Sequence, residues 1–449
     1  MSYVLYDMYA DRINRASTIK QFGKVTQVVG LVIESAGPAI SIGRLCHIEN
    51  HDGSTILAEV VGFRDDRLLL MPYGPISGIN PGAIVTSTSD QLRIPVGPGL
   101  IGRVLGGLGQ PIDSKGPIAA GVTRPVSSSP IPVLDRRRIV EPIRTGIKAI
   151  DVMTAVGKGQ RLGVFAGSGV GKSVMLGMIA RNSSADINVI ALIGERGREV
   201  KEFIERDLGE AGLQRSVVVA VSSDQPALVR IKGAMVATAI AEYFREQGKD
   251  VLLLMDSVTR VAIAQREIGL ALGEPPATKG YTPSVFALLP TLLERAGCDK
   301  HGSITGLYAV LVEADDFNEP ISDAVRSILD GHVALSRRLA SLNQYPAVDV
   351  LDSISRLMKD VSTEEEVQLA GEVRELFSIY TEAEDLINIG AYVKGSNPRI
   401  DRAIEKFDPL RRLLRQGINE RCVHRDVIAQ LREILHGVTS GSQKVQIPA

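Results

Sequence analysis

Residues 162–173 read LGVFAGSGVGKS, and this stretch decides the fold of the 449-residue chain. An apolar run, LGVF, leads into a glycine-rich loop, and the segment SVMLGMIA that follows is predicted to be a helix. This order of strand, loop and helix is typical of a phosphate-binding loop, or P-loop, with the spacing Gly-x-x-x-x-Gly-Lys-Ser. Ala166 replaces the first glycine of that pattern, and a small residue there keeps the same turn. The stretch therefore predicts an α/β nucleotide-binding domain.

The residue types of this loop suit the binding of a triphosphate. Glycines let successive backbone N–H groups turn toward an anion, and the N-terminus of the next helix adds its partial positive charge. Lys172 can reach β- and γ-phosphate oxygens, and the Ser173 hydroxyl can ligate Mg²⁺. A Gly-Lys-Ser string also occurs by chance, but the strand–loop–helix context favours function. The predicted nucleotide-binding residues are Gly167, Ser168, Gly169, Val170, Gly171, Lys172 and Ser173.

Two further apolar runs end in carboxylates. The run VLLLM ends in Asp256, which in a P-loop enzyme would complete the magnesium site opposite Ser173. The alternative is an ordinary acid at the end of a strand. The run NVIALIG ends in Glu195, and a carboxylate at a neighbouring strand tip can polarise an attacking water. The alternative for Glu195 is a salt-bridged charge cluster, because Glu and Arg alternate in the string GERGRE.

Sequence texture divides the chain into several parts. Residues 1–20 have apolar side chains at helical spacing, which predicts a helix that packs on its own domain or docks a partner. Short β-rich runs with Gly, Asn and Asp turns in residues 21–92 predict a small closed barrel. In residues 93–360 continuous apolar strands alternate with helices, as in a parallel sheet covered on both faces. Residues 361–449 are predicted to be a helical domain.

Helix signals support the assignment of this last part. Ser362 and Glu365 have the spacing of a capping box, so the acidic triplet there is interpreted as a solvated helix start rather than a metal site. Further helices are expected at 381–389, 398–405 and 423–435.

Composition limits the class of protein. A hydrophobic content of 44% suits folded domains, and the length fits about three of them at ~150 residues each. Lys+Arg (51) and Asp+Glu (52) nearly cancel, so the whole chain lacks the basic footprint of a nucleic-acid binder. Three well-separated cysteines, Cys46, Cys298 and Cys422, argue against a disulfide framework or a zinc site and suit a reducing cytosol. Because no signal core and no run of ~18 to 20 apolar residues is visible, we expect a soluble, cytoplasmic protein.

Five strings carry a family resemblance: EPIRTGIKAID before the loop, AGSGVGKS, GERGREV, LLLMDSVTR and PAVDVLDSISR. Together they resemble the α/β-subunit family of rotary ATPases, over about residues 25–404. GERGREV, GEPPATKGY at 273–281 and PSVFALLPTLLERAG are similar to the type III secretion ATPase branch. ATKGY and the stretch SIYTEAEDLINIGAYVKGSNPRIDRAI favour the flagellar type III protein export ATPase over the enzyme of virulence injectisomes.

The resemblance implies a RecA-like P-loop ATPase core with an N-terminal small β-barrel and a C-terminal helical domain. It also implies a homohexamer with active sites between subunits, in which hydrolysis of Mg-ATP energises protein export. By motif, Lys172 and Ser173 would bind phosphate and Mg²⁺, Asp256 would complete the metal site, and Glu195 would activate water.

Three further roles are carried over in the same way. Arg196, in the GER string, would lie near the γ-phosphate, and Arg356 would be an arginine finger that reaches the neighbouring subunit's site. Tyr345 would stack on adenine. If the resemblance is set aside, Arg356 is interpreted as a loop arginine that forms a surface ion pair. Tyr345 is then interpreted as a partly buried core tyrosine.

Partners are implied as well. A coiled-coil stalk protein would sit in the central pore, faced by residues 273–281 and 314–323. A regulator protein would bind the N-terminal region, and export substrates with their chaperones would dock near the C-terminal domain. The ring would make peripheral contact with an export gate at the inner membrane, and no nucleic acid is expected.

Three other functions stay open at this point. A rotary ATP synthase catalytic subunit shares the P-loop, GER and PAVD strings, but it differs at GERGREV and at residues 273–295. A non-catalytic nucleotide-binding subunit would lack the acid at position 195. A RecA-like RNA translocase would need a basic or aromatic surface, whereas aromatic residues make up 4% of this chain and Trp is absent.

Overall fold

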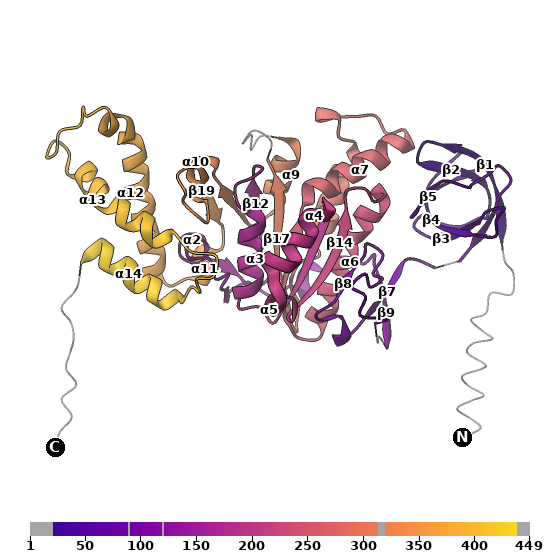
Figure 1. Ribbon diagram of the computed structural model, residues 1–449, viewed down its shortest axis with the longest axis horizontal. Coiled ribbons are helices and arrows are strands. Elements are labelled where there is room, and N and C mark those ends of the chain that lie inside the picture. The colour runs from indigo at the N-terminus through magenta and orange to yellow at the C-terminus, as the bar shows by residue number, and fades with distance from the viewer. Residues whose placement is uncertain (1–20, 89, 119–120, 313–318, 438–449) are drawn as a thin grey trace, which may run out of the picture.

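The computed structural model describes residues 21–437, apart from 89, 119–120 and 313–318. Three blocks follow one another along an elongated molecule, with a barrel at one end, a helix-covered sheet in the middle and a helical block at the other end (Figure 1). The helix predicted within residues 1–20 lies outside the described residues, as do residues 314–318 of the segment expected to face the pore.

The first block is a closed barrel, as predicted. Its strands are hydrogen-bonded in the order β1-β2-β5-β4-β3-β6, so no strand edge is left open. Ile33, Ile48, Leu70 and Val85 point into the barrel and are fully buried. The strands are β1 (Phe22–Val29), β2 (Val32–Ala36), β3 (Leu45–Glu49), β4 (Thr55–Arg64), β5 (Arg67–Pro72) and β6 (Ile84–Ser87).

The middle block is built on a nine-stranded sheet. All neighbours in the main path are parallel except the edge strand β19, which is antiparallel to β18, and β16 (Gly297–Cys298) adds a short antiparallel pairing to β17. In spatial order the strands are β19 (Val348–Ser355), β18 (Gly331–Leu335), β12 (Arg161–Ala166), β17 (Ser303–Leu311), β15 (Asp250–Asp256), β13 (Ile187–Glu195), β14 (Ser216–Ser222) and β8 (Val104–Leu105).

Both faces of this sheet are buried, which explains why its strands are continuously apolar. Val189 and Ile193 of β13 belong to one core, and Ile190 and Leu192 belong to another on the opposite face. The first core includes α6 (Ala227–Glu246), α7 (Val258–Leu272), α8 (Pro283–Leu293) and α9 (Pro320–Ile328). The second includes α2 (Lys148–Met153), α3 (Lys172–Asn182) and the π-helix η3 (Phe203–Leu208).

Short elements connect these layers. They are β7 (Arg93–Val96), β9 (Val122–Pro125), β10 (Pro142–Ile143), β11 (Val156–Gly157), α4 (Gly197–Glu202), α5 (Gly209–Leu213), α10 (Arg337–Ser341), α11 (Met358–Val361), η1 (Pro98–Leu100), η2 (Val133–Asp135) and η4 (Thr278–Gly280). Asp151 lies within α2, and its buried carboxylate accepts hydrogen bonds from the backbone N–H groups of Thr145 (2.7 Å) and Gly146 (2.9 Å), which precede the helix. These hydrogen bonds explain in structural terms why Thr, Gly and Asp occur together in the string EPIRTGIKAID.

The third block is helical and packs against the second core. Its helices are α12 (Glu364–Asn388), α13 (Pro398–Leu414) and α14 (His424–His436). The predicted capping box was wrong by one residue. Thr363 is the N-cap of α12: its Oγ1 accepts from Glu366 N (3.2 Å), and Thr363 N donates to Glu366 Oε2 (2.8 Å). Among the helices of the described ranges, none is both long and apolar enough to cross a membrane.

Barrel and core meet through a buried charged contact. Lys232 of α6 donates to Glu59 of β4 (Nζ to Oε1, 2.8 Å), and the Tyr73 hydroxyl donates to the same carboxylate. Each of the three side chains belongs to a residue only 7% exposed. Because a buried carboxylate must be compensated by donors, this contact fixes how the barrel sits on the core.

Candidate active site

The P-loop connects the end of β12 to the start of α3. Ala166 is buried at the strand end, where it lies beside Leu311 of β17 and Leu335 of β18. That environment has room for a small side chain, which explains why alanine is accepted in place of the first glycine. Gly171, in the left-handed region (φ 89°), is the N-cap of α3, so Lys172 and Ser173 occupy the helix's first turn.

Lys172 forms an ion pair with Asp256, the last residue of β15. Strands β12 and β15 are separated only by β17, and all three are parallel, so their carboxyl ends meet at one edge of the sheet. Asp256 is only 3% exposed, whereas Ser173 is exposed. The structure thus brings together the lysine and acid that the sequence predicted.

Glu195 ends β13, next to β15, with Leu192 in register with Asp256. Burial, and then the negative charge of Asp256, raise the pKa of Glu195 to about 7, while Lys172 and Arg260 oppose the rise. Glu195 Oε1 is buried and has no hydrogen-bond partner among the described residues. A buried carboxylate oxygen without a protein partner is suited to hold a water.

A glycine is required just before this acid. Gly194 has φ 72°, and a Cβ there would lie 2.9 Å from Arg260 Cβ. Arg260, near the start of α7, also has a buried Nε with no partner in the described part of the chain. Arg260 is the last residue of the string LLLMDSVTR, but no role was predicted for it. Its position four residues after a strand-ending acid was the available signal.

Two predicted arginines lie away from this cluster. The Arg196 side chain is 77% exposed and forms an ion pair with Glu199 (2.9 Å). In this structure Arg196 is therefore part of a surface charge cluster. Arg356 is exposed and follows β19, where its N–H donates to Asp330 O (3.0 Å). Asp330 N in turn donates to Arg161 O (2.9 Å) at the start of β12. Because the P-loop follows the end of β12, Arg356 lies roughly 16 Å along the strand direction from its own P-loop.

Tyr345 lies beside the P-loop, at a cavity of about 450 Å³. A Cβ built on Gly171 would be 3.4 Å from Tyr345 Cε1, so the ring rests against the loop. The ring is therefore placed to stack on a base whose phosphates occupy the loop. The cavity is lined by Gly169, Gly171, Val174, Met175, Met178, Tyr345, Pro346, Arg415, Gln416, Gly417 and Ile418.

This sheet topology, with a P-loop, an acid at a strand tip and a second carboxylate at the tip of the adjacent strand, defines a P-loop ATPase with a RecA-like core. Residues 25–89 match the ATP synthase alpha/beta family beta-barrel domain, and residues 146–355 match its nucleotide-binding domain. Residues 362–433 match the T3SS EscN ATPase C-terminal domain. The chain belongs to the ATP synthase alpha/beta family, within its type III secretion and flagellar ATPases, and is an ATP-hydrolysing enzyme.

Individual relatives show which members of the family this chain is similar to. It is 55% identical over 428 residues to the flagellum-specific ATP synthase of Bacillus subtilis, covering 94% of this chain and 97% of that protein. It is 48% identical to the type 3 secretion system ATPase of Xanthomonas euvesicatoria, covering 92% and 94%. The assembled ATPase EscN from enteropathogenic E. coli has 44% identity and a TM-score of 0.88, covering 92% of this chain and 100% of that one. The family resemblance read from the sequence is confirmed.

Proposed function

We propose that this chain hydrolyses Mg-ATP as a homohexamer and thereby energises flagellar type III protein export. The observation that carries the catalytic part is the unpartnered carboxylate oxygen of Glu195 beside the Lys172–Asp256 pair. The flagellar assignment is supported by 55% identity to the flagellum-specific enzyme of B. subtilis.

The residues at the sheet edge fit a Mg²⁺ ion. Ser173 offers a hydroxyl and Asp256 a carboxylate, both close to Lys172, and hard oxygen ligands suit this cation. In the described part of the chain, no group of three or more His, Cys, Asp or Glu residues is arranged so that it could hold a metal ion by itself. Such a sparse set suits Mg²⁺, which keeps waters and phosphate oxygens as its other ligands. When bound, the ion neutralises charge that develops on the phosphates.

Each side chain then has a distinct task in hydrolysis. In the free site Lys172 neutralises Asp256, and with ATP bound its ammonium group is placed to hold β- and γ-phosphate oxygens. The Glu195 carboxylate accepts a hydrogen bond from the attacking water and orients it toward the γ-phosphate. Arg260 limits the charge of this pair of acids, and Tyr345 stacks on adenine.

The position of Arg356 supports a site completed by a second copy. It lies at the amino edge of the sheet, where it cannot reach its own P-loop, yet it is exposed and so available to a neighbour. An arginine finger contributes roughly 10³ to 10⁵ in rate in other NTPases. A ring of identical subunits with head-to-tail contacts presents each Arg356 to the next site.

We base the proposed partners and cellular location on the relatives of this chain. EscN has been solved with its central stalk EscO, which supports a stalk protein in the pore of this ring. We further propose a regulator at the N-terminal region, substrate–chaperone complexes at the C-terminal domain, and a cytoplasmic ring in peripheral contact with the inner-membrane export gate. We propose that the N-terminal helix spans residues 1–20, the barrel 21–92, the ATPase domain 93–360 and the C-terminal helical domain 361–449.

Purified variants test the catalytic part. Lys172→Ala should lose nucleotide binding, because the loop then has no cation for the phosphates. Glu195→Gln should bind Mg-ATP with about wild-type affinity yet release phosphate at least roughly 10²-fold more slowly. Equilibrium binding of a fluorescent ATP analogue and a phosphate-release assay separate the two steps. A Glu195→Gln protein with wild-type turnover would contradict the assigned role.

An injectisome ATPase is the second candidate, favoured by the TM-score of 0.88 to EscN. Genes beside this one for flagellar rod, hook and filament proteins would support the flagellar function. Deletion in the source organism should then abolish swimming and the export of hook protein. Normal motility with a loss of effector secretion would instead establish the injectisome function.

A further inference from the structure

The cavity next to the P-loop has walls from two domains. Val174, Met178 and Tyr345 come from the ATPase core, whereas residues 415–418 follow α13 in the C-terminal helical domain. The phosphate side of the site is fixed by strands of one sheet. The base side, in contrast, depends on how the two domains are held together.

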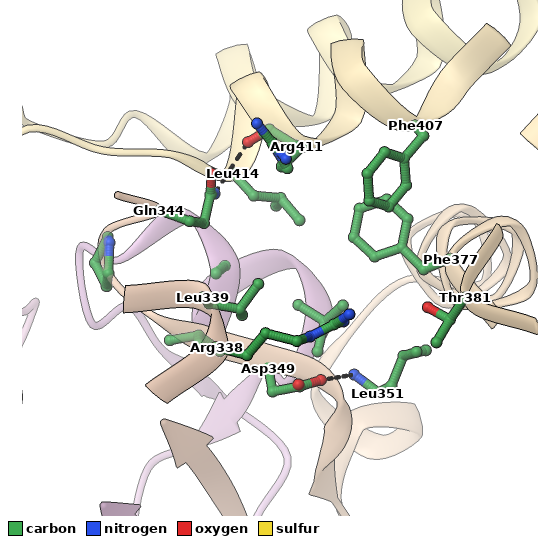
Figure 2. Close-up of a pocket in the computed structure, with 14 residues that line it drawn as sticks. Arg338, Leu339, Gln344, Asp349, Leu351, Phe377, Thr381, Phe407, Arg411 and Leu414 are labelled. Carbon is green, nitrogen blue, oxygen red and sulfur yellow. Dashed lines mark hydrogen bonds between the residues drawn. The ribbon is translucent and has the colours of Figure 1, made fainter. Parts of the chain in front are cut away.

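The loop that carries Tyr345 is tied to the C-terminal domain at two points. Gln344, only 8% exposed, donates from Nε2 to the carbonyl of Arg411 on α13 (3.1 Å; Figure 2). On the other side of the loop, the backbone N–H of Gln416 donates to the Tyr345 carbonyl (2.9 Å). The tyrosine ring is therefore placed by partners outside the ATPase core.

Gln416 also joins a third segment. Its side-chain Nε2 donates to Gly146 O (2.8 Å) and to Glu420 O (2.9 Å), and its Oε1 accepts from Lys148 N (2.9 Å). The residue is 4% exposed. Both amide donors are thus used within the protein, so the side chain serves as a tie between segments and not as a reader of the base.

We infer that Gln344 and Gln416 are positioning residues that hold Tyr345 and the 415–418 wall against the nucleotide base. Through these two residues the C-terminal domain sets the affinity for the base without changing the affinity for the triphosphate. The inference rests on the proposed ATP site and adds to it the residues that govern binding of one half of the ligand.

The test compares two ligands on the full-length chain. Gln416→Met and Gln344→Met remove the side-chain hydrogen bonds while keeping a side chain of similar length, and the backbone N–H of residue 416 can still donate to Tyr345 O. We expect the Kd for Mg-ATP to rise roughly tenfold in each variant, whereas the Kd for inorganic tripolyphosphate with Mg²⁺ stays within about twofold. Gln368→Met is the matched control, because Gln368 is exposed on α12 and far in sequence from the cavity. Calorimetric Tm values show whether each variant folds.

A double-mutant cycle makes the test stricter. In a Tyr345→Ala background, Gln344→Met should weaken ATP binding by less than about twofold further, because its effect passes through the ring already removed. Equal losses of ATP and tripolyphosphate affinity would overturn the inference, as would unchanged ATP affinity in both folded Met variants. A wild-type chain that binds neither ligand would overturn the proposed function, and this inference with it.

Discussion

The pKa of Glu195 is set by neighbouring groups with opposite effects. Burial and the Asp256 charge favour its neutral form, while Lys172 and Arg260 favour the carboxylate, and the result is a pKa raised to about 7. An acid with this pKa can accept a hydrogen bond from water near neutral pH and still change its protonation within the physiological range.

This balance predicts a pH dependence. Water activation needs the ionised form, so kcat should rise between about pH 6 and about pH 8, as the Glu195 proton is lost. Since folding raises the pKa from 4.5 to about 7, the contribution of Glu195 to stability is fully present below about pH 4.5 and is lost as the pH rises from there through about 7. Phosphate release across this range checks the first point, and melting curves of wild type and Glu195→Gln check the second. A Glu195→Gln protein that loses as much stability as wild type between about pH 4.5 and about pH 7 would contradict this assignment of the proton.

Sequence patterns located residues whose neighbours are close in the chain or fixed by topology. Lys172, Glu195 and Asp256 each lie at a strand end, and parallel strands bring such ends together. Gln416 could not be found in this way, because its amide partners Gly146 and Lys148 lie 270 and 268 residues away. Arg260 was missed for another reason: its one signal, a position four residues after the strand-ending Asp256, was not used.

Two helices meet closely on the face of the sheet that carries the P-loop helix. A Cβ on Gly177 of α3 would lie 2.6 Å from the Asp207 carbonyl oxygen of the π-helix η3. That π-helix belongs to the helical segment that begins just after Glu195. The helix that carries Lys172 and the segment that follows Glu195 are therefore packed backbone to backbone. Sequence periodicity gave the helix α3 but not the π-turn, because no residue pattern marks an extra residue in one turn.

Gly177→Ala should separate these two elements. The added methyl meets backbone rather than a movable side chain, so we expect a loss of about 1–3 kcal/mol in stability and a lower kcat. Gly371→Ala is the matched control: this glycine lies within α12 with nothing near its Cβ, so the change should stabilise by up to about 1 kcal/mol. Chemical denaturation and turnover measurements compare the two. Equal effects of the two substitutions would show that the close packing has no energetic weight.

At the scale of the whole molecule, the three blocks are joined by polar contacts that are buried. Lys232, Glu59 and Tyr73 connect barrel to core, and Gln416 connects core to helical domain. The division into barrel, α/β core and helices could be predicted from strand and helix texture. The joints between them could not, because a buried Lys or Gln looks like any surface residue until its partner is known. The antiparallel edge strand β19, which leads to Arg356, was likewise absent from the predicted sheet.

The barrel joint should be sensitive to the loss of its cation. Lys232→Met leaves the Glu59 carboxylate buried with the Tyr73 hydroxyl as its remaining donor, so we expect a destabilisation of about 3–5 kcal/mol. Adding Glu59→Gln should recover part of this loss, because the uncompensated charge is removed. Thermal unfolding of the single and double variants provides the measurement. Lys232→Met with wild-type stability would mean that the carboxylate is solvated in the barrel joint.

A ring of identical subunits makes a prediction that no single chain can satisfy. Arg356 lies at the edge of the sheet opposite its own P-loop, so each site must take this residue from a neighbour if the residue acts in catalysis. Arg356→Ala and Glu195→Gln proteins should each be nearly inactive alone. Mixed in equal amounts, about a quarter of interfaces join an intact Glu195 on one side to an intact Arg356 on the other, and phosphate release should reappear. Mixing must be shown independently, for example by energy transfer between labelled subunits. Proven mixing without recovered turnover would place Arg356 outside the catalytic site, and the ring would then need another source for its trans-acting charge.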